Sequence, residues 1–171
     1  MSHRYAIALG SNRRHGRHGA PGGVIAAALA ALEADGMAVL RASPILPTPP
    51  LGPGGRTFAN AAALIACELD PPALLARLKR IERRFGRRRG RRWGARVLDL
   101  DIILWNGGIW RSPGPGTLAV PHRAYTKRLF VLQPLAAIVP CWRDPRLQRT
   151  VRQLLARALR RSPVDRTRAA P

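Results

Sequence analysis

The chain has 171 residues, the usual length of one domain, and its 46% of hydrophobic residues excludes a wholly disordered protein. Thirty Lys and Arg residues oppose nine Asp and Glu residues, and the formal net charge of +21 exceeds what an ordinary metabolic enzyme needs for solubility. This charge indicates an anionic partner, either nucleic acid or the phosphates of a small molecule. Only two of the thirty are lysines, and an excess of Arg, Ala, Gly and Pro is also typical of GC-rich genomes, so part of the charge carries no mechanistic meaning.

The first third of the chain predicts strands and helices in alternation. Residues 5–9 form a short apolar run that the turn residues 10–12 end, which is typical of a buried strand. Ile25, Leu29 and Leu32 recur at helical spacing, and Gly36 supplies a C-terminal stop. The other predicted segments are a polar loop over 13–23, a helix over 24–35, a strand over 37–43 and a loop over 44–55, too rich in Pro and Gly for helix or sheet.

The rest of the chain continues the alternation and adds hairpins. A strand is predicted over 57–68, and Asp70 and Pro71 have the residue types of a helix cap and a first helical position. That helix ends at Gly86. The remaining segments are an arginine-dense loop over 86–92, a strand over 96–105, a hairpin turn over 106–108 into 109–110, a short strand before Pro121, and helices over 130–138 and 150–159. This pattern predicts an α+β fold with a mostly antiparallel sheet.

The cysteines and the apolar runs exclude several other classes of protein. Cys67 and Cys141 form no CxxC pair, and the four histidines complete no zinc pattern, so we expect both cysteines to be small buried residues. No run of about 18 apolar residues occurs, and the first residues lack the apolar region of a signal peptide. We expect a cytoplasmic monomer with a single domain over 1–161 and a frayed tail over 162–171.

Two aspartates on one predicted strand give the clearest chemical signal. Side chains at i and i+2 of a strand share a face, so Asp99 and Asp101 point the same way while their apolar neighbours face the core. Two adjacent carboxylates repel each other unless a cation lies between them. Mg²⁺ fits this arrangement because it takes one or two carboxylates and completes its shell with water and phosphate oxygens. The alternative is a polar outer face whose acids pair with nearby arginines.

An arginine-rich segment directly precedes this strand. Between Arg77 and Arg96 there are eleven Lys or Arg residues and one acid, Glu82. Guanidinium groups match phosphate oxygens and offset the charge that develops in phosphoryl transfer, so the segment could hold a triphosphate. A solvated face or a nucleic-acid patch would have the same composition. The chain contains neither a P-loop nor a dinucleotide-binding glycine motif.

A second group of residues could bind a flat polar ring. Phe58 and Asn60 are two residues apart on a predicted strand and therefore share a face, close to the Pro-rich loop that contains Thr48. An aromatic plate beside an amide that both donates and accepts is suited to a heterocycle. The alternative is that both residues serve packing and turn formation.

These residues resemble the signature of the 6-hydroxymethyl-7,8-dihydropterin pyrophosphokinase family of folate biosynthesis. The strongest similarity lies in the segment RWGARVLDLDII at residues 92–103. Five further segments match in the family's order and spacing, at residues 8–12, 48–53, 58–62, 80–87 and 120–130. Together they cover about residues 5–135.

The resemblance implies transfer of pyrophosphate from ATP to the hydroxymethyl group of the pterin, leaving AMP, on a ferredoxin-like three-layer α/β/α sandwich. It implies two Mg²⁺ ions held by Asp99 and Asp101, with Arg87 and Arg96 as further catalytic residues. The pterin-binding residues that it implies are Thr48, Leu51, Phe58, Asn60, Trp93 and Phe130, with the rings of Phe58 and Phe130 on either side of the pterin. The implied ATP-binding residues are Arg87, Arg89, Arg92, Arg96, His122 and Arg128.

The chain departs from the family pattern at a few positions. Phe58 stands where Tyr is common, so a hydroxyl hydrogen bond is lost while stacking is retained. Ala119 and Arg123 also differ from the frequent residues, and the loop over 13–23 is longer and more basic than usual. These differences bear on substrate affinity more than on the reaction.

Two alternative functions share some of these features. A basic nucleic-acid-binding domain would explain the charge, but the chain has no RNP-type aromatic strand. A Mg²⁺-dependent nuclease could use the same two aspartates, but it would need further carboxylates nearby. Neither alternative explains the Thr48–Asn60 segment. For the loop over 86–92, we expect like-charge repulsion to keep it open until MgATP supplies the counter-charge.

Overall fold

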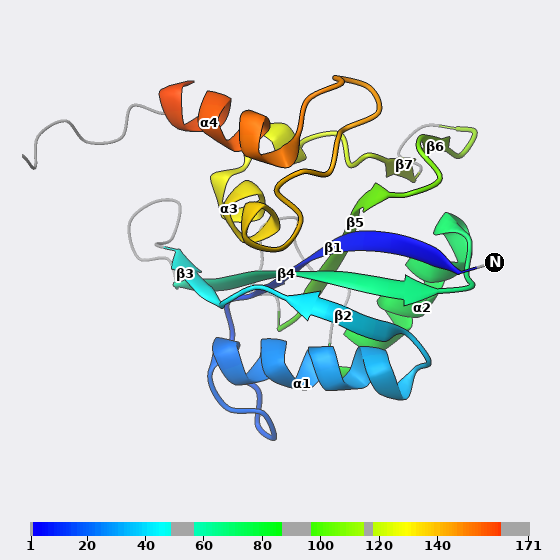
Figure 1. Cartoon of the computed structure of the whole chain (residues 1–171). Helices are drawn as coiled ribbons and strands as arrows, with labels where there is room; N and C mark the ends of the chain where they lie inside the picture. The colour runs from blue at the N-terminus through cyan, green and yellow to red at the C-terminus, as the bar shows by residue number, and fades with distance from the viewer. Residues whose placement is uncertain (1, 49–56, 87–96, 115–117, 162–171) are drawn as a thin grey trace, which may run out of the picture.

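The computed structural model describes residues 2–48, 57–86, 97–114 and 118–161 (Figure 1). Nearly every element predicted from the sequence within these ranges is present. In chain order the elements are β1 (His3–Ser11), α1 (Pro21–Ala34), β2 (Ala38–Ala42), β3 (Leu46–Thr48), β4 (Phe58–Cys67), α2 (Pro71–Arg84), β5 (Asp99–Trp105), β6 (Trp110–Arg111), β7 (Ala119–Val120), the 3₁₀ helix η1 (Tyr125–Lys127), α3 (Leu129–Ile138) and α4 (Val151–Arg161).

The main sheet has the strand order β2-β4-β1-β5, and all of its pairings are antiparallel. Leaving out β3, the elements from β1 to β5 follow the order βαββαβ, with the first and last strands adjacent. This is the ferredoxin-like arrangement. The predicted α+β class and mostly antiparallel sheet are therefore confirmed.

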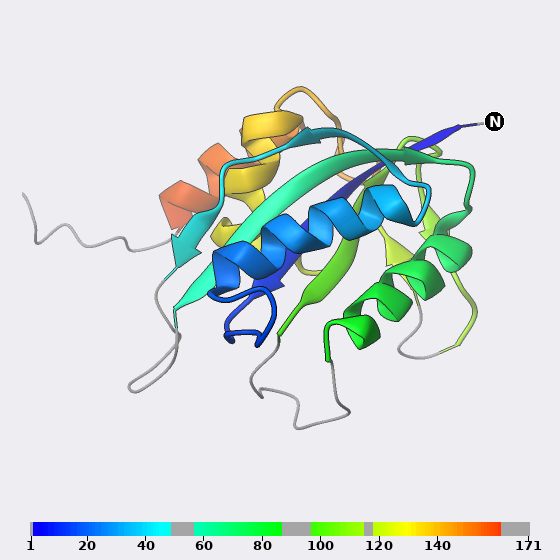
Figure 2. The ribbon, with the colours of Figure 1, turned by 90° about the horizontal axis from the view of Figure 1, so that it is seen from below.

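Helices cover both faces of the sheet and make it the middle of three layers. Helices α1 and α2 lie on one face, and α3 lies on the other with α4 packed outside it (Figures 1 and 2). Each face has its own apolar core, and β1 contributes to both: Tyr5, Ile7 and Leu9 pack toward α1 and α2, whereas Ala6 packs toward α3. Within the described segments, no helix combines the length and the apolarity that crossing a bilayer requires.

The strand β4 differs from the alternating strand that the sequence predicts. Its burial does not alternate, because β4 lies between β1 and β2 and helices cover both of its faces. Next to it lies β3, within the segment that we expected to be neither helix nor sheet. That expectation is wrong for Leu46–Thr48, which pairs with β4. Pro47 is accommodated because β3 is an edge strand, in which some backbone N–H groups have no strand partner, so a residue without an N–H is tolerated.

Three other predictions are corrected. The turn after β5 is present, but it does not form a hairpin with β5: β6 pairs with β7, while β5 pairs with β1. Helix α1 begins at Pro21 rather than Val24, because proline fits the first helical turn. Cys67 is buried as expected, but Cys141 is exposed because it lies in the turn after α3.

The predicted cap of α2 and the predicted glycine stops of α1 and α2 are confirmed. The Asp70 side chain accepts a hydrogen bond from the Ala73 amide at 2.9 Å and caps α2. Gly36 and Gly86 follow α1 and α2 with φ of +83° and +79°, a backbone region that glycine adopts without strain.

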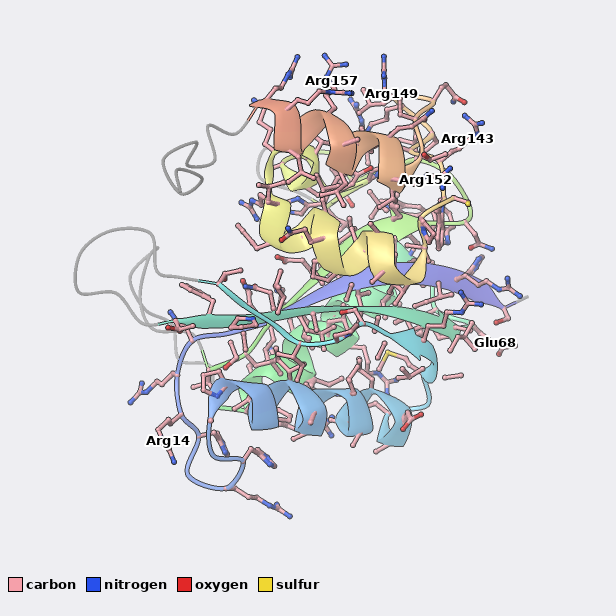
Figure 3. The ribbon with its side chains drawn as sticks, turned by 60° about the vertical axis from the view of Figure 1, so that its left-hand side comes forward. Arg14, Glu68, Arg143, Arg149, Arg152 and Arg157 are labelled. Carbon is pink, nitrogen blue, oxygen red and sulfur yellow. The ribbon has the colours of Figure 1, made fainter. Side chains whose placement is uncertain are left out.

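Exposed arginines cover the outer side of α4 and the loop before it. Arg143, Arg149, Arg152 and Arg157 are all exposed, Arg149 and Arg157 point away from the sheet in Figure 3, and α4 itself contains no acidic residue. Four of the thirty basic residues of the chain therefore lie on this outer layer, away from the two strands that carry the aspartates and the Phe58–Asn60 pair.

A buried polar cluster fixes η1 and thereby the segment over 121–128. The Tyr125 hydroxyl donates to Asp144 Oδ2 at 2.8 Å, and Arg146 Nη2 donates to the same oxygen at 3.1 Å. Tyr125 and Asp144 are both fully buried. Burial raises the pKa of Asp144, but the hydrogen bonds from Arg146 and Tyr125 outweigh it and leave the pKa below its ordinary value.

We expect Asp144→Asn to lower the free energy of unfolding at pH 7 by about 1–3 kcal/mol. A carboxyl with a lowered pKa stabilises the fold above its ordinary pKa, and this contribution disappears as the pH falls through the lowered value. The variant should therefore lose less stability than the parent between pH 7 and pH 3, as measured by urea unfolding. The exposed Glu68 supplies the control: Glu68→Gln should keep the acid dependence of the parent. Equal acid dependence in parent and Asp144→Asn would contradict the assignment.

Candidate active site

The candidate site is built on one row of residues across the sheet. Gly10 of β1 pairs with Asn60 of β4 on one side and with Asp99 of β5 on the other. Neighbouring strands lie about 4.8 Å apart, so Asn60 and Asp99 are separated by about 10 Å across the row. A Cβ atom on Gly10 would lie 3.4 Å from Asn60 Oδ1, an ordinary van der Waals contact, so Gly10 adds no side chain beside Asn60.

The face on which this row lies follows from the packing. Ala59 and Ala61 of β4 and Leu100 of β5 belong to the core under α1 and α2. Since side chains alternate along a strand, Asn60 and Asp99 point to the opposite face, where α3 covers part of the sheet. Asp101 lies two residues further along β5, paired with Ala8, and also points to this face. The prediction that the two aspartates share a face is confirmed.

One end of the row carries the residues expected to bind a flat ring. Asn60 is buried, and its Nδ2 donates a hydrogen bond to Thr48 Oγ1 at 2.7 Å. Thr48 is the last residue of β3 and pairs with Phe58 of β4. Phe58 is half-buried and two residues from Asn60. The prediction that Thr48, Phe58 and Asn60 lie together is therefore confirmed.

The other end of the row carries the two carboxylates at the edge of the sheet. The side chain of Asp99 is 22% exposed and that of Asp101 is 37% exposed, so both can be reached by a ligand. Strand β5 is the outermost strand, and the side of its backbone that faces away from β1 has no strand partner among the described residues.

Two side chains of α2 satisfy this free edge instead. The Leu100 amide, between the two aspartates, donates to Glu82 Oε1 at 2.7 Å, and the Leu100 carbonyl accepts from Lys79 Nζ at 3.2 Å. Glu82 is completely buried, and Lys79 Nζ also donates to Glu82 Oε1 at 2.7 Å. Lys79 and Glu82 are therefore the connection that holds β5 against α2.

The Lys79 ammonium lies next to both aspartates. Its Nζ is 4.0 Å from Asp99 Oδ1 and 3.9 Å from Asp101 Oδ1. A positive charge thus lies about 4 Å from an oxygen of each aspartate, and it offsets part of the repulsion between the two carboxylates.

The segment before α3 brings a third group of residues to this face. The His122 amide donates to the carbonyl of Ile103 in β5 at 3.0 Å, which places His122 beside the strand of the aspartates. Burial lowers the pKa of the His122 imidazole, while Asp101 opposes this shift and Arg128 adds to it. The guanidinium carbon of Arg128 lies 5.9 Å from the centre of the Phe130 ring, and Phe130 is half-buried on α3.

A cavity of about 500 Å³ opens at the end of the sheet near Phe58. It is lined by Asn12, Arg13, Arg14, Pro21 and Thr57. Its lining comes from the loop after β1, the first residue of α1 and the residue before β4, and it includes neither the aspartates nor Phe58 and Asn60.

Several predicted site residues lie outside the described part of the chain: Leu51, Arg87, Arg89, Arg92, Trp93 and Arg96. The expected closure of the loop over 86–92 falls there as well, apart from Gly86. In the described ranges, no group of three or more His, Cys, Asp and Glu residues is arranged to hold a metal ion.

Sequence reasoning missed the roles of Lys79 and Glu82. Their signal was an acid on the apolar side of an amphipathic helix: Glu82 follows Leu78 by four residues and Ile81 by one, and both of these residues are buried. A carboxylate at such a position requires buried partners. The three-residue spacing from Lys79 to Glu82 supplies one of them.

Comparison with known proteins identifies a single family. The family model described as 7,8-dihydro-6-hydroxymethylpterin-pyrophosphokinase (HPPK) matches residues 6–140. The 2-amino-4-hydroxy-6-hydroxymethyldihydropteridine pyrophosphokinase of Pseudomonas aeruginosa is 40% identical over 147 residues, which cover 85% of this chain and 86% of the relative. The protein of the same name from Haemophilus influenzae is 40% identical over 134 residues, covering 77% of this chain and 79% of the relative.

Some matched proteins are longer than this chain. A relative of the same name from Synechocystis is 41% identical over 104 residues, and the match spans 52% of its length. The crystal structure of Plasmodium falciparum HPPK-DHPS aligns with a TM-score of 0.71 at 14% identity, covering 94% of this chain and 42% of that one. At this identity the structural match shows the fold alone.

Proposed function

Because the chain belongs to the 7,8-dihydro-6-hydroxymethylpterin-pyrophosphokinase family, we propose that it transfers pyrophosphate from ATP to 6-hydroxymethyl-7,8-dihydropterin, leaving AMP. The observation that carries this proposal is the row Asn60–Gly10–Asp99, which sets a ring-binding end about 10 Å from a carboxylate pair. That spacing suits a flat heterocycle at one end and a triphosphate at the other. The reported relatives give no support to the nucleic-acid-binding and nuclease alternatives.

The pterin lies at the Asn60 end of the row. The Asn60 amide and the Thr48 hydroxyl, already joined by a hydrogen bond, read its polar edge, with the Leu51 backbone as a third partner. Phe58 from β4 and Phe130 from α3 stack on the two sides of the ring. Trp93 completes the substrate-binding set.

The nucleotide lies at the β5 end of the row, where cationic side chains offset its negative charge. His122 and Arg128 reach it from the segment before α3, since His122 is anchored beside β5. The other nucleotide-binding residues in this proposal come from the arginine-rich segment: Arg87, Arg89, Arg92 and Arg96.

The aspartate pair fits a magnesium site. Asp99 and Asp101 supply two carboxylates on one face, both partly exposed, and the Lys79 ammonium about 4 Å from both supports a positively charged ligand at this position. Mg²⁺ takes one or two carboxylates from a protein and completes its shell with water and substrate phosphates. Two such ions would neutralise the phosphate charges and lower the proton affinity of the attacking alcohol.

The remaining residues position the reacting atoms. Asn60 and the two phenylalanines orient the pterin so that its hydroxymethyl oxygen meets the β-phosphorus of ATP in line. The oxygen forms a bond to the β-phosphorus, the bond from the β-phosphorus to the α,β-bridging oxygen breaks, and AMP leaves with that electron pair. The alcohol releases its proton to solvent water as the new bond forms. Arg87 and Arg96 act as catalytic cations that offset the charge on the transferred phosphates.

Product analysis tests this function. Incubation of the protein with MgATP and the pterin should give AMP and pterin diphosphate in equal amounts, and none without the pterin. Chromatography of nucleotides and pterins measures both. Formation of ADP with a pterin monophosphate, or ATP consumption that ignores the pterin, would contradict the proposal.

Replacement of Phe130 by Ala tests the position of the pterin. Loss of the stacking ring should weaken pterin binding by about 1–3 kcal/mol. Nucleotide affinity should change less, because Arg128, whose guanidinium lies 5.9 Å from the ring centre, keeps its charge. Calorimetric titration measures both affinities. Phe130→Tyr keeps the ring and should bind the pterin like the parent; equal pterin affinity for Phe130→Ala would place the ring elsewhere.

Two earlier expectations stay predictions. We expect the protein to act on its small-molecule substrates as a monomer in the cytoplasm. The described residues include no membrane-spanning helix.

A further inference from the structure

The Lys79 ammonium has no role in the pyrophosphate transfer proposed above. It lies within 4.0 Å of carboxylate oxygens of Asp99, Asp101 and Glu82 and hydrogen bonds the Leu100 carbonyl between the two aspartates. Its side chain is 34% exposed and extends from α2 to the edge of β5. Four contacts with oxygen acceptors hold it there.

We propose that Lys79 is a built-in counter-cation of the aspartate pair, which weakens metal binding to the nucleotide-free protein and makes metal entry depend on the phosphates of the nucleotide. This inference rests on the proposed role of Asp99 and Asp101 as metal ligands. It adds a residue that sets when the metal binds.

Two carboxylates on one face of a strand repel each other, and a nearby ammonium offsets this repulsion without any metal ion. The strand therefore keeps both side chains in place before the substrates arrive. Lys79 remains at this position because Glu82, fully buried, holds its Nζ at 2.7 Å.

A divalent cation that approaches the two aspartates meets the positive charge of Lys79 about 4 Å from the same oxygens, and this repulsion lowers its affinity. A triphosphate brings several negative charges and additional oxygen ligands to the site. The ion that enters with the nucleotide is therefore favoured over the free ion.

Binding of Mn²⁺ to the nucleotide-free protein tests this inference. Free Mn²⁺ is measured by its electron paramagnetic resonance signal during titration. Lys79→Met removes the charge, and Lys79→Gln removes it while keeping a side chain that can donate to Glu82 and Leu100. Both variants should bind Mn²⁺ about tenfold more tightly than the parent. The other lysine of the chain, the exposed Lys127, supplies the matched control, and Lys127→Met should stay within twofold of the parent. Affinities within twofold of the parent for both Lys79 variants would overturn the inference.

A second measurement uses the unaltered protein. Because the chain has only two lysines, a spectrum of ¹⁵N-labelled lysine ammonium groups contains one signal from each, and Lys127→Met assigns them. Addition of Mg²⁺ with a non-hydrolysable ATP analogue should shift the Lys79 signal and leave that of Lys127 in place. An unmoved Lys79 signal at saturation would overturn the inference.

Failure of the proposed function gives a different result. Asp101→Asn should lose Mn²⁺ binding whatever the role of Lys79. If this variant binds Mn²⁺ as the parent does, the metal assignment is wrong. If only the Lys79 variants match the parent, the metal site stands and Lys79 is a structural contact.

Discussion

Replacement of Asp101 by Asn is expected to reduce pterin-dependent AMP formation by about a thousandfold or more. Loss of a metal ligand removes several kcal/mol of stabilisation from the phosphoryl-transfer transition state. The fold should persist, because the Asp101 side chain is 37% exposed and Asn has nearly the same shape. Initial rates at saturating Mg²⁺ and ATP, together with a thermal melt, measure the two effects.

The control for this variant removes one acidic charge elsewhere. Glu68 is exposed and follows β4 at the end of that strand (Figure 3). Glu68→Gln should form AMP at the rate of the parent. If Asp101→Asn also works at close to the parent rate in Mg²⁺, the aspartate pair is not the metal site.

Replacement of Glu82 by Ala is expected to cost about 2–3 kcal/mol of unfolding free energy. The change removes the acceptor of the Leu100 amide and the partner of Lys79, both at 2.7 Å, from a completely buried position. Strand β5 then loses part of its connection to α2. Urea unfolding followed by circular dichroism measures the loss.

Glu82→Gln separates the hydrogen bond from the charge. Its amide oxygen can still accept from Leu100, so this variant should retain more stability than Glu82→Ala. Equal stability of Glu82→Ala and the parent would show that α2 does not hold the edge of β5 through this side chain.

The arrangement of the site residues within each strand could be predicted from the sequence. The two-residue period of a strand places Asp99 with Asp101 and Phe58 with Asn60 on common faces, and both pairs are confirmed. Helix caps such as Asp70 were predictable for a similar reason, since they depend on a few neighbouring residues.

Features that depend on distant partners could not be predicted in this way. The row Asn60–Gly10–Asp99 requires the registers of two strand pairings, which the three segments do not encode locally. Strand β3 forms despite Pro47 because β4 offers an open side, and β6 pairs with β7 rather than with β5, although β5 has a free edge. The contacts of Lys79 with β5 likewise depend on how α2 packs.

The family resemblance added roles that residue patterns alone left open. Spacing indicated a cation beside the aspartates and a ring beside Asn60, whereas the identity of the ring and the transferred group came from the matching segments. For the arginines of the segment over 87–96, these roles stay predictions.

The proposed function is tested by a crystal structure of the complex with Mg²⁺, the pterin and an ATP analogue carrying a methylene group between the α- and β-phosphorus atoms. We expect the pterin against Asn60 and Thr48 and the β- and γ-phosphates, with their metal ions, against Asp99 and Asp101, both on the α3 face of the sheet. A pterin or triphosphate bound on the face under α1 and α2, or a triphosphate away from β5, would contradict the proposed function.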